Sequence, residues 1–182
     1  RVLEKLGARF IDVRVPGAED AHTHATTIIY SDACAVHEER LEAGGPQWHP
    51  HTLERMRMGL AYTGRDYARA MREREAWHRT LQKVFSEVDV LLSPTSPTTA
   101  PTIADDRSLF EATRAATRNT YAGAFGNLPG LSVPCGFSPD GMPIGLMFEA
   151  APWQDVTVLR AGAAYQAQTD WHLRTPGLPV NE

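Results

Sequence analysis

The sequence predicts an α/β fold in which helices flank a mixed β-sheet. Residues 67–88 repeat apolar side chains every three or four positions, as an amphipathic helix does. Two apolar runs, 131–137 and 143–149, flank Asp140-Gly141, which is a strong hairpin signal. A third apolar run, 89–92, stops at a proline-containing loop, as a strand leaving a sheet does.

The chain begins with an apolar helix face that Gly7 terminates, so we expect the sequence to start inside an element. Alternating apolar and polar residues then predict a strand over Arg9–Val15. Residues 20–41 mix helix formers with Thr-Thr-Ile-Ile. The second half of that stretch favours a helix, and the first half is left open. A further helix is expected from Leu53, ahead of the long one.

The second half of the chain predicts two more helices around the hairpin. Ser108 and Glu111 have the spacing of a capping box, which predicts a helix from there to about Thr120. The last helix is expected over Gln154–Thr169, with a peripheral tail from 176 to 182. No internal repeat or long linker divides the sequence, so we predict a single unit.

Composition excludes several classes of function. The 182 residues are 42% hydrophobic and carry a net charge of -4, which suits a globular domain and offers no general attraction for nucleic acid or anionic lipid. No apolar run approaches the roughly 20 residues that cross a bilayer. The charged start does not suit a signal peptide. These features predict a cytoplasmic protein.

Hydrolysis by an activated serine needs a hydroxyl on a tight turn beside backbone donors. None of the seven serines fits, and three of them precede a proline, which favours extended backbone. The only lysines, Lys5 and Lys83, are expected at ordinary surface positions. The sequence therefore predicts no catalytic serine or lysine within these residues.

Other chemistries find weak support. Cys34 and His37 lie three apart on a predicted helix, but nothing nearby supplies an orienting group. The pairs His22/His24 and His49/His51 lack a third metal ligand. The glycine-containing stretch 126–130 leads into a strand, where a phosphate loop would lead into a helix. We therefore expect no metal, no nucleotide and no organic cofactor.

The stretch Arg118–Glu149, RNTYAGAFGNLPGLSVPCGFSPDGMPIGLMFE, resembles the late segment of the amidase-signature family. There a Leu-Pro turn leads to Ser-Val-Pro-Cys-Gly and then to a Gly-x-Pro-x-Gly strand. The run Asp89–Thr95 with its following prolines resembles the strand and proline loop that the family places upstream. The resemblance covers essentially the whole chain and is most specific from Asp89 onward.

The resemblance implies that residues 1–182 are the C-terminal portion of a single amidase-signature domain. Family members cleave a carboxamide through an acyl-enzyme, using a lysine and two serines, one of them in a cis peptide. Those residues belong to an upstream glycine- and serine-rich signature that this sequence lacks. The implied partners are a small amide substrate and the missing N-terminal catalytic portion, with a homodimer as a further possibility. The chain alone is predicted to be inactive.

Three substrate-binding candidates follow from the resemblance. Arg55 resembles a position where some glutamine-using members hold the substrate's carboxylate, which suits a guanidinium, and an ordinary exposed arginine on a helix is the equal alternative. Thr95 lies on the proline loop and Asn119 precedes the Leu-Pro turn, although both residue types also serve in caps and turns.

Two alternatives to an amide hydrolase stay open. One is the A-type subunit of a glutamine-dependent tRNA amidotransferase. Such members usually carry an aspartate shortly before the Leu-Pro turn, and residues 117–121 contain none. The other is a noncatalytic binding or assembly module.

Overall fold

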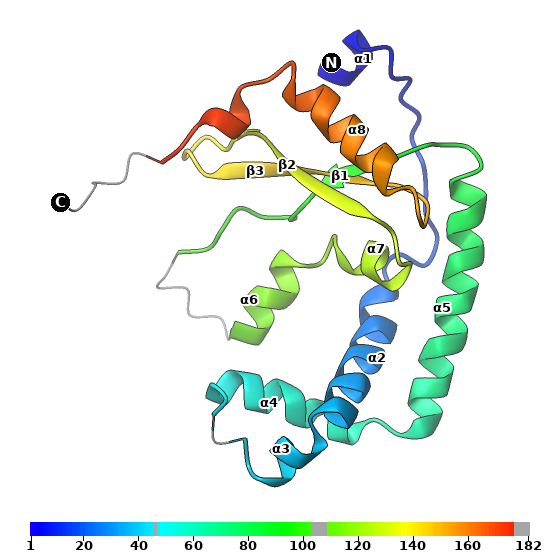
Figure 1. Cartoon of the computed structure of the whole chain (residues 1–182), viewed down its shortest axis with the longest axis vertical. Coiled ribbons are helices and arrows are strands. Elements are labelled where there is room, and N and C mark those ends of the chain that lie inside the picture. The colour runs from blue at the N-terminus through cyan, green and yellow to red at the C-terminus, as the bar shows by residue number, and fades with distance from the viewer. Residues whose placement is uncertain (46, 103–108, 177–182) are drawn as a thin grey trace, which may run out of the picture.

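The computed structural model describes residues 1–45, 47–102 and 109–176. Its helices are α1 (Val2–Lys5), α2 (Ala21–Val36), α3 (Glu38–Glu42), α4 (Pro50–Met58), α5 (Gly64–Val84), α6 (Leu109–Ala116), α7 (Tyr121–Phe125) and α8 (Asp155–Gln166). Two 3-10 turns, η1 (Gly59–Ala61) and η2 (Trp171–Leu173), and the strands β1 (Leu91–Pro94), β2 (Gly130–Phe137) and β3 (Pro143–Glu149) complete it. The α/β class with helices flanking a sheet is thus confirmed. In Figure 1, α8 lies on one side of the sheet and α6 and α7 lie on the other.

The sheet has the order β1-β3-β2, and both pairings are antiparallel. The expected mixture of strand directions is therefore wrong for the strands that the structure describes. One pairing is the hairpin of β2 with β3, and the other brings β1 back along the far edge of β3.

The predicted hairpin is confirmed. The Ser138 N–H donates to the carbonyl of Met142 at 2.8 Å, and the Gly141 N–H donates to the carbonyl of Ser138 at 2.9 Å. Gly141 has a φ of 82°, a left-handed conformation that glycine adopts without strain. The register contains an irregularity at Cys135, which lets Pro134 and Gly136 pair with adjacent residues of β3.

One hydrophobic core lies between the sheet and α8. Phe148 of β3 is 1% exposed and packs in one cluster with Val133 of β2 and with Val158 and Tyr165 of α8. Val2 and Leu3 of α1 border this cluster. The terminal helix therefore covers the face of the sheet that alternate strand residues make apolar.

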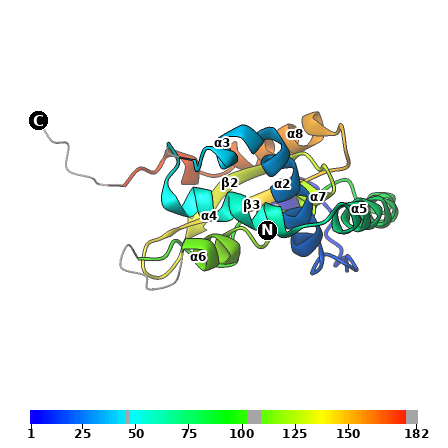
Figure 2. The same cartoon turned by 90° about the horizontal axis from the view of Figure 1, so that it is seen from below.

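A second core joins α2, α5 and α7. Ala25 and Ile28 of α2 pack in one cluster with Trp77 of α5 and Phe125 of α7. The indole N–H of Trp77 donates to the carbonyl of Ala122 at 2.9 Å, which ties α5 to α7. Figures 1 and 2 both show α5 along one side of the molecule. Its apolar stripe packs inward, as the repeat in the sequence predicted.

The ambiguous stretch 20–41 forms two helices. α2 is helical from Ala21 to Val36, and α3 follows it directly. The β-branched residues do not prevent this, since Ala21, Ala25 and Ile28 lie at helical spacing and are buried against the second core. Packing outweighs the small difference in intrinsic propensity. The helix expected from Leu53 begins earlier, at Pro50.

Several predicted boundaries change. Arg9–Val15 has no regular secondary structure and pairs with none of the described strands, so the predicted strand is wrong for this structure. A strand needs a partner to complete its backbone hydrogen bonds, and none of the described strands lies beside it. The helix expected up to Thr120 stops at Ala116, and α7 begins five residues later. The predicted cap Ser108 and the tail from 177 onward lie outside the described residues.

Within the described ranges, no helix combines the length and the apolar character that crossing a lipid bilayer requires.

Candidate functional site

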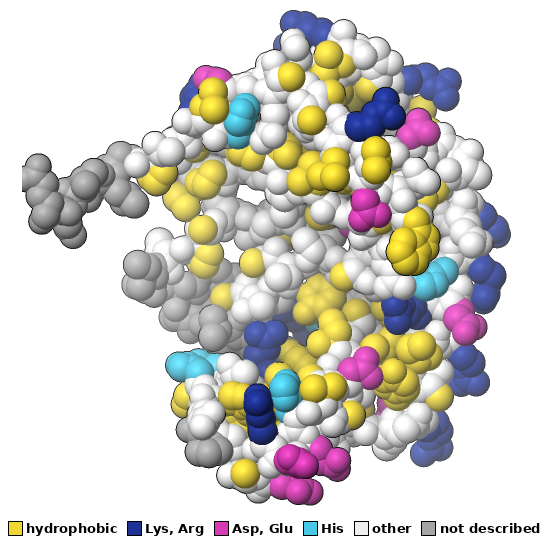
Figure 3. All heavy atoms as spheres, in the orientation of Figure 1, with side chains coloured by type: hydrophobic (Ala, Val, Ile, Leu, Met, Phe, Trp, Pro, Cys, Tyr) yellow, Lys and Arg dark blue, Asp and Glu magenta, His cyan; other side chains and the backbone are white. Residues whose placement is uncertain are grey.

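The two faces of the sheet differ in polarity. Strand alternation and the register place Ser93, Ser132, Met147 and Glu149 on the face opposite to Phe148 and α8. This second face, here called the polar face, is directed toward the side where Figure 1 shows α6 and α7. Figure 3 shows the molecular surface indented between this sheet layer and the helices below it. The polar face is therefore where a small molecule can meet hydrogen-bonding groups.

Thr95 and Ser132 form a hydroxyl pair on the polar face. Thr95 Oγ1 and Ser132 Oγ are 2.6 Å apart, and either atom can be the donor. One hydroxyl proton serves this bond, so the other remains free to donate elsewhere. Gly145 of β3 lies between them, where a Cβ would stand 2.7 Å from Thr95 Oγ1 and 2.8 Å from Ser132 Oγ. A glycine is thus required for the two hydroxyls to meet.

Asn119 reaches the same region from the connection between α6 and α7. Its Nδ2 donates to the carbonyl of Pro94 at 2.8 Å, next to Thr95. The Thr95 N–H in turn donates to the carbonyl of Gly145 at 2.9 Å, which extends the sheet by one residue beyond β1. The predicted candidates Thr95 and Asn119 therefore lie close together, and the amide oxygen of Asn119 is not used in the Pro94 bond.

Glu149 is the acidic group of the polar face. It ends β3, and its carboxylate packs against Gly123 of α7, where any Cβ would overlap Oε1. Burial raises the pKa of Glu149 from its usual 4.5 to about 7. A carboxyl poised near neutrality can accept or donate a proton, and such groups gather at functional sites more often than elsewhere.

Arg55, the third predicted candidate, lies in a different place. It belongs to α4, which Figure 1 shows beyond α6 from the sheet. Its Nε donates to the hydroxyl of buried Tyr30 of α2 at 3.1 Å. That bond leaves the terminal nitrogens of the guanidinium available. The structure therefore does not bring Arg55 to the hydroxyl pair, and it gives this side chain a role in holding α4 on α2.

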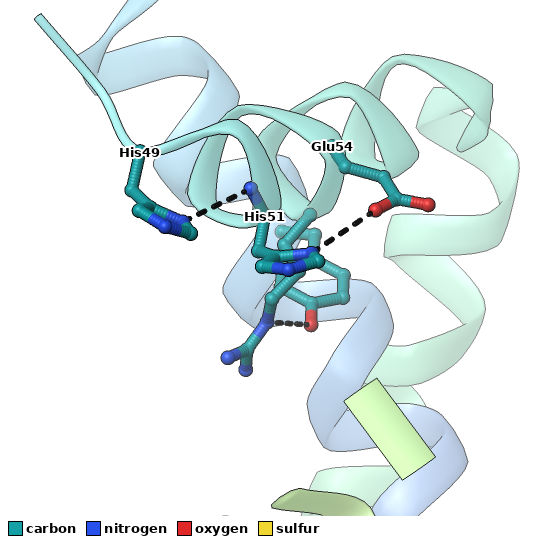
Figure 4. A network of polar contacts seen from close by, with 5 residues as sticks. His49, His51 and Glu54 are labelled. Carbon is teal, nitrogen blue, oxygen red and sulfur yellow. Dashed lines mark hydrogen bonds and ion pairs between the residues drawn. The ribbon is translucent and has the colours of Figure 1, made fainter. Parts of the chain in front are cut away.

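The histidines singled out in the sequence have local roles. His49 Nδ1 accepts from the N–H of His51 at 3.4 Å and so caps α4, while His51 Nδ1 lies 3.8 Å from a carboxylate oxygen of Glu54 (Figure 4). The rings of His22 and His24 contact Tyr121 and Phe125. Over the described ranges, no three His, Cys, Asp or Glu side chains are placed to share a metal ion.

Cys34 and His37 do not act together. The thiol of Cys34 donates to the carbonyl of Met56 at 2.9 Å, whereas the ring of His37 contacts Trp48. Burial raises the pKa of Cys34, which disfavours the thiolate that a nucleophile needs. Lys5 and Lys83 are both exposed, as the sequence predicted.

Sequence reasoning missed Ser132, Gly145 and Glu149. Ser132 and Gly145 stand inside the two motifs that carry the family resemblance, but their contact depends on the register of three strands. Glu149 could have been found from the sequence. It is a charged residue at the end of an apolar run that must be buried on at least one face, and a charged residue in such a place is unusual.

Comparison with known proteins identifies the family. The family model described as Amidase matches residues 1–159. The chain belongs to the amidase family. It is 32% identical to an amidase of Pseudomonas putida over 97% of this chain and 39% of that protein. It is also 32% identical to the A-type subunit of the glutamyl-tRNA(Gln) amidotransferase of Chloroflexus aggregans, over 97% of this chain and 41% of that protein.

Solved amidase-family structures share the fold. A crystal structure of an amidase superposes with a TM-score of 0.80 at 29% identity, covering 91% of this chain and 39% of the other. A structure described as a vestigial protein complex, which reveals the origins of an s-triazine catabolic enzyme, gives a TM-score of 0.83 at 28% identity, covering 96% and 39%. The chain therefore spans about two fifths of the length of these amidase-family relatives.

Proposed function

We propose that residues 1–182 form the C-terminal portion of a single amidase-signature domain and contribute the substrate-facing wall of an amide hydrolase. The observation that carries this proposal is the hydroxyl pair of Thr95 and Ser132 beside Asn119, built from the very motifs that match the family. Amide groups both donate and accept hydrogen bonds. Hydroxyl and carboxamide side chains can donate a hydrogen bond to the carbonyl oxygen of an amide substrate and accept one from its N–H group.

The chemical step is proposed to use residues outside this sequence. A serine from a Ser–cis-Ser–Lys set attacks the carbonyl carbon, the C–N bond breaks, and the amine or ammonia leaves with a proton. Water then cleaves the resulting ester and releases the acid.

The test compares the 182-residue chain with the full polypeptide that contains it. Both are assayed for ammonia or amine release from simple aliphatic amides, aryl amides and glutamine. We expect turnover by the full polypeptide and none above background by the 182-residue chain. Hydrolysis by the 182-residue chain at a specific activity that stays constant through successive purification steps would show that the nucleophile lies within it.

A second candidate function is that of the A-type amidotransferase component, because several relatives of similar identity carry that name. Arg55 is the residue of interest here, since its free guanidinium nitrogens suit the carboxylate of glutamine. The absence of an aspartate in 117–121 counts against this candidate. Glutamine turnover that Arg55→Ala abolishes, together with copurifying subunits, would favour it over the simple hydrolase. A polypeptide without turnover on any amide would favour the noncatalytic module.

Gly145→Ala tests the hydroxyl pair in the full polypeptide. The added methyl would force Thr95 and Ser132 apart, because it would stand under 3 Å from both side-chain oxygens. We expect kcat/KM for the preferred amide to fall about tenfold or more, since small displacements of positioning groups are costly. Gly130→Ala is the matched control, because its Cβ would meet the nearest atom at an ordinary 3.8 Å. Equal kcat/KM for both variants and the wild type would show that the hydroxyl pair does not take part in substrate binding or turnover.

A further inference from the structure

The turn between β3 and α8 contains a residue that its backbone does not favour. The N–H of Gln154 donates to the carbonyl of Ala151 at 3.0 Å, which closes a four-residue turn. The third residue of this turn, Trp153, has a φ of 70°. Turns with a positive φ at that position usually place glycine or asparagine there, because a bulky side chain is strained in the left-handed region.

Burial does not compensate for the strain at Trp153. Its side chain is 92% exposed, which is the highest exposure of any large hydrophobic side chain in the described ranges. A tryptophan that is both strained and exposed adds little to the stability of the fold. Strained residues are concentrated at functional sites, so this ring indicates a binding surface.

Trp153 lines a groove of about 830 Å³ between the C-terminal part of α5, the connection from α7 to β2 and the connection from β3 to α8 (Figure 1). This volume lies within the range of small-molecule sites, roughly 300–1,000 Å³. Asn127 is the other non-glycine residue with a positive φ in the described ranges, and it lines the same groove. Both residues with left-handed backbone and a side chain therefore meet at this groove.

The charges around the groove favour a cation. Asp155 lines it, is exposed and forms no ion pair with any described residue. No lysine or arginine is among the lining residues, and the guanidinium of Arg74, outside the lining, donates to the Phe125 carbonyl and to Asn127. Burial, with a smaller contribution from Arg74, lowers the pKa of His78, so this lining imidazole is uncharged at neutral pH. An exposed indole near an unpaired carboxylate attracts an organic ammonium group.

We propose that this groove binds a small organic ammonium ion, whose cationic head lies against the indole face of Trp153 and the carboxylate of Asp155. The half-buried ring of Phe85 provides a second apolar contact. The Nε2 atom of His78 is buried without a hydrogen-bond partner among the described residues, so it adds an unused polar atom. Neither the hydroxyl pair nor Asn119 lines the groove, and the inference is therefore independent of the proposed hydrolase.

The test is isothermal titration calorimetry of the full polypeptide with choline and with dimethylbutanol, the neutral isostere in which carbon replaces the nitrogen. The two probes have the same shape, so a difference between them reports the charge. We expect choline to bind about tenfold more tightly or better. Asp155→Asn should weaken choline binding by about tenfold. Glu73→Gln should leave it unchanged, because it removes an exposed charge of α5 outside the groove.

Trp153→Gly removes the ring and keeps the turn, because glycine suits a positive φ. It should weaken choline binding by about tenfold or more. The midpoint of thermal unfolding should stay nearly unchanged, since relief of strain offsets the greater freedom of glycine in the unfolded chain. Equal binding of the two probes, or a Trp153→Gly affinity within about twofold of the wild type, would overturn the proposal. So would a fall of the midpoint by more than about 5 °C, because the ring would then be packed against another part of the polypeptide.

Discussion

Phe148→Ala should lower the free energy of unfolding of the 182-residue chain by about 3–5 kcal/mol. The side chain is 1% exposed and belongs to the central strand β3, one position before its end at Glu149. It packs in the core beneath α8, where its ring lies 6.3 Å from that of Tyr165. Truncation removes the transfer free energy of the ring and leaves a cavity between two layers that cannot close easily, because β3 is held on both sides.

Urea unfolding followed by circular dichroism measures this effect. Phe137→Ala is the matched control, since Phe137 ends β2 in the same hairpin, is 42% exposed and touches Trp171 edge-on. We expect it to cost less than half as much as Phe148→Ala, because less apolar surface is lost from the interior. Equal costs at the two positions would mean that α8 does not pack on the sheet in solution.

Glu149→Gln should remove a pH-dependent loss of stability. Burial raises the pKa of Glu149 from 4.5 to about 7, so the folded protein binds its proton more tightly than the unfolded chain does. The resulting stabilisation is fully present below pH 4.5 and is lost as the pH rises through about 7. At pH 9 the wild-type chain therefore carries a buried carboxylate whose desolvation is uncompensated.

The expected effect of Glu149→Gln on the free energy of unfolding is large enough to measure. At about 1.4 kcal/mol per pKa unit the shift corresponds to at most roughly 3 kcal/mol, and partial exposure of the carboxyl lowers this to about 2 kcal/mol. We expect Glu149→Gln to be more stable than the wild type by about that amount at pH 9 and nearly equal to it at pH 5. Urea unfolding at a series of pH values gives the difference.

Glu73→Gln is the control for Glu149, because Glu73 is an exposed glutamate on α5. It should leave the slope of stability against pH between 5 and 9 as in the wild type. A wild-type chain whose slope in that interval matches that of Glu149→Gln would show that the carboxyl is solvated at neutral pH.

Phe148 and Glu149 are neighbours in sequence with opposite environments. Strand alternation directs one side chain into the core beneath α8 and the other onto the polar face. In the sequence both residues belong to one apolar run. The run therefore predicted a strand, and Glu149 was not recognised as a candidate site residue. The distinction between the two faces required knowledge of which helices cover each side.

Local sequence signals were sufficient for elements whose structure depends on residues close together in the sequence. The Asp140-Gly141 turn determines the hairpin, and the apolar repeat determines α5. Thr95 and Asn119 were located by motif resemblance, and the structure places them together. Local signals failed at residues 9–15, because alternation predicts an extended chain but does not provide a neighbouring strand.

The amino-acid sequence by itself determined the family, the α/β class, the hairpin and the long helix. The tertiary structure alone decided that Ser132 meets Thr95 across Gly145, that Arg55 lies apart from them, and that Glu149 is partly buried. The physical reason is the range of the interactions. Turns and helix stripes depend on residues a few positions apart, whereas strand register and the burial of a carboxyl depend on segments that meet only when the chain folds.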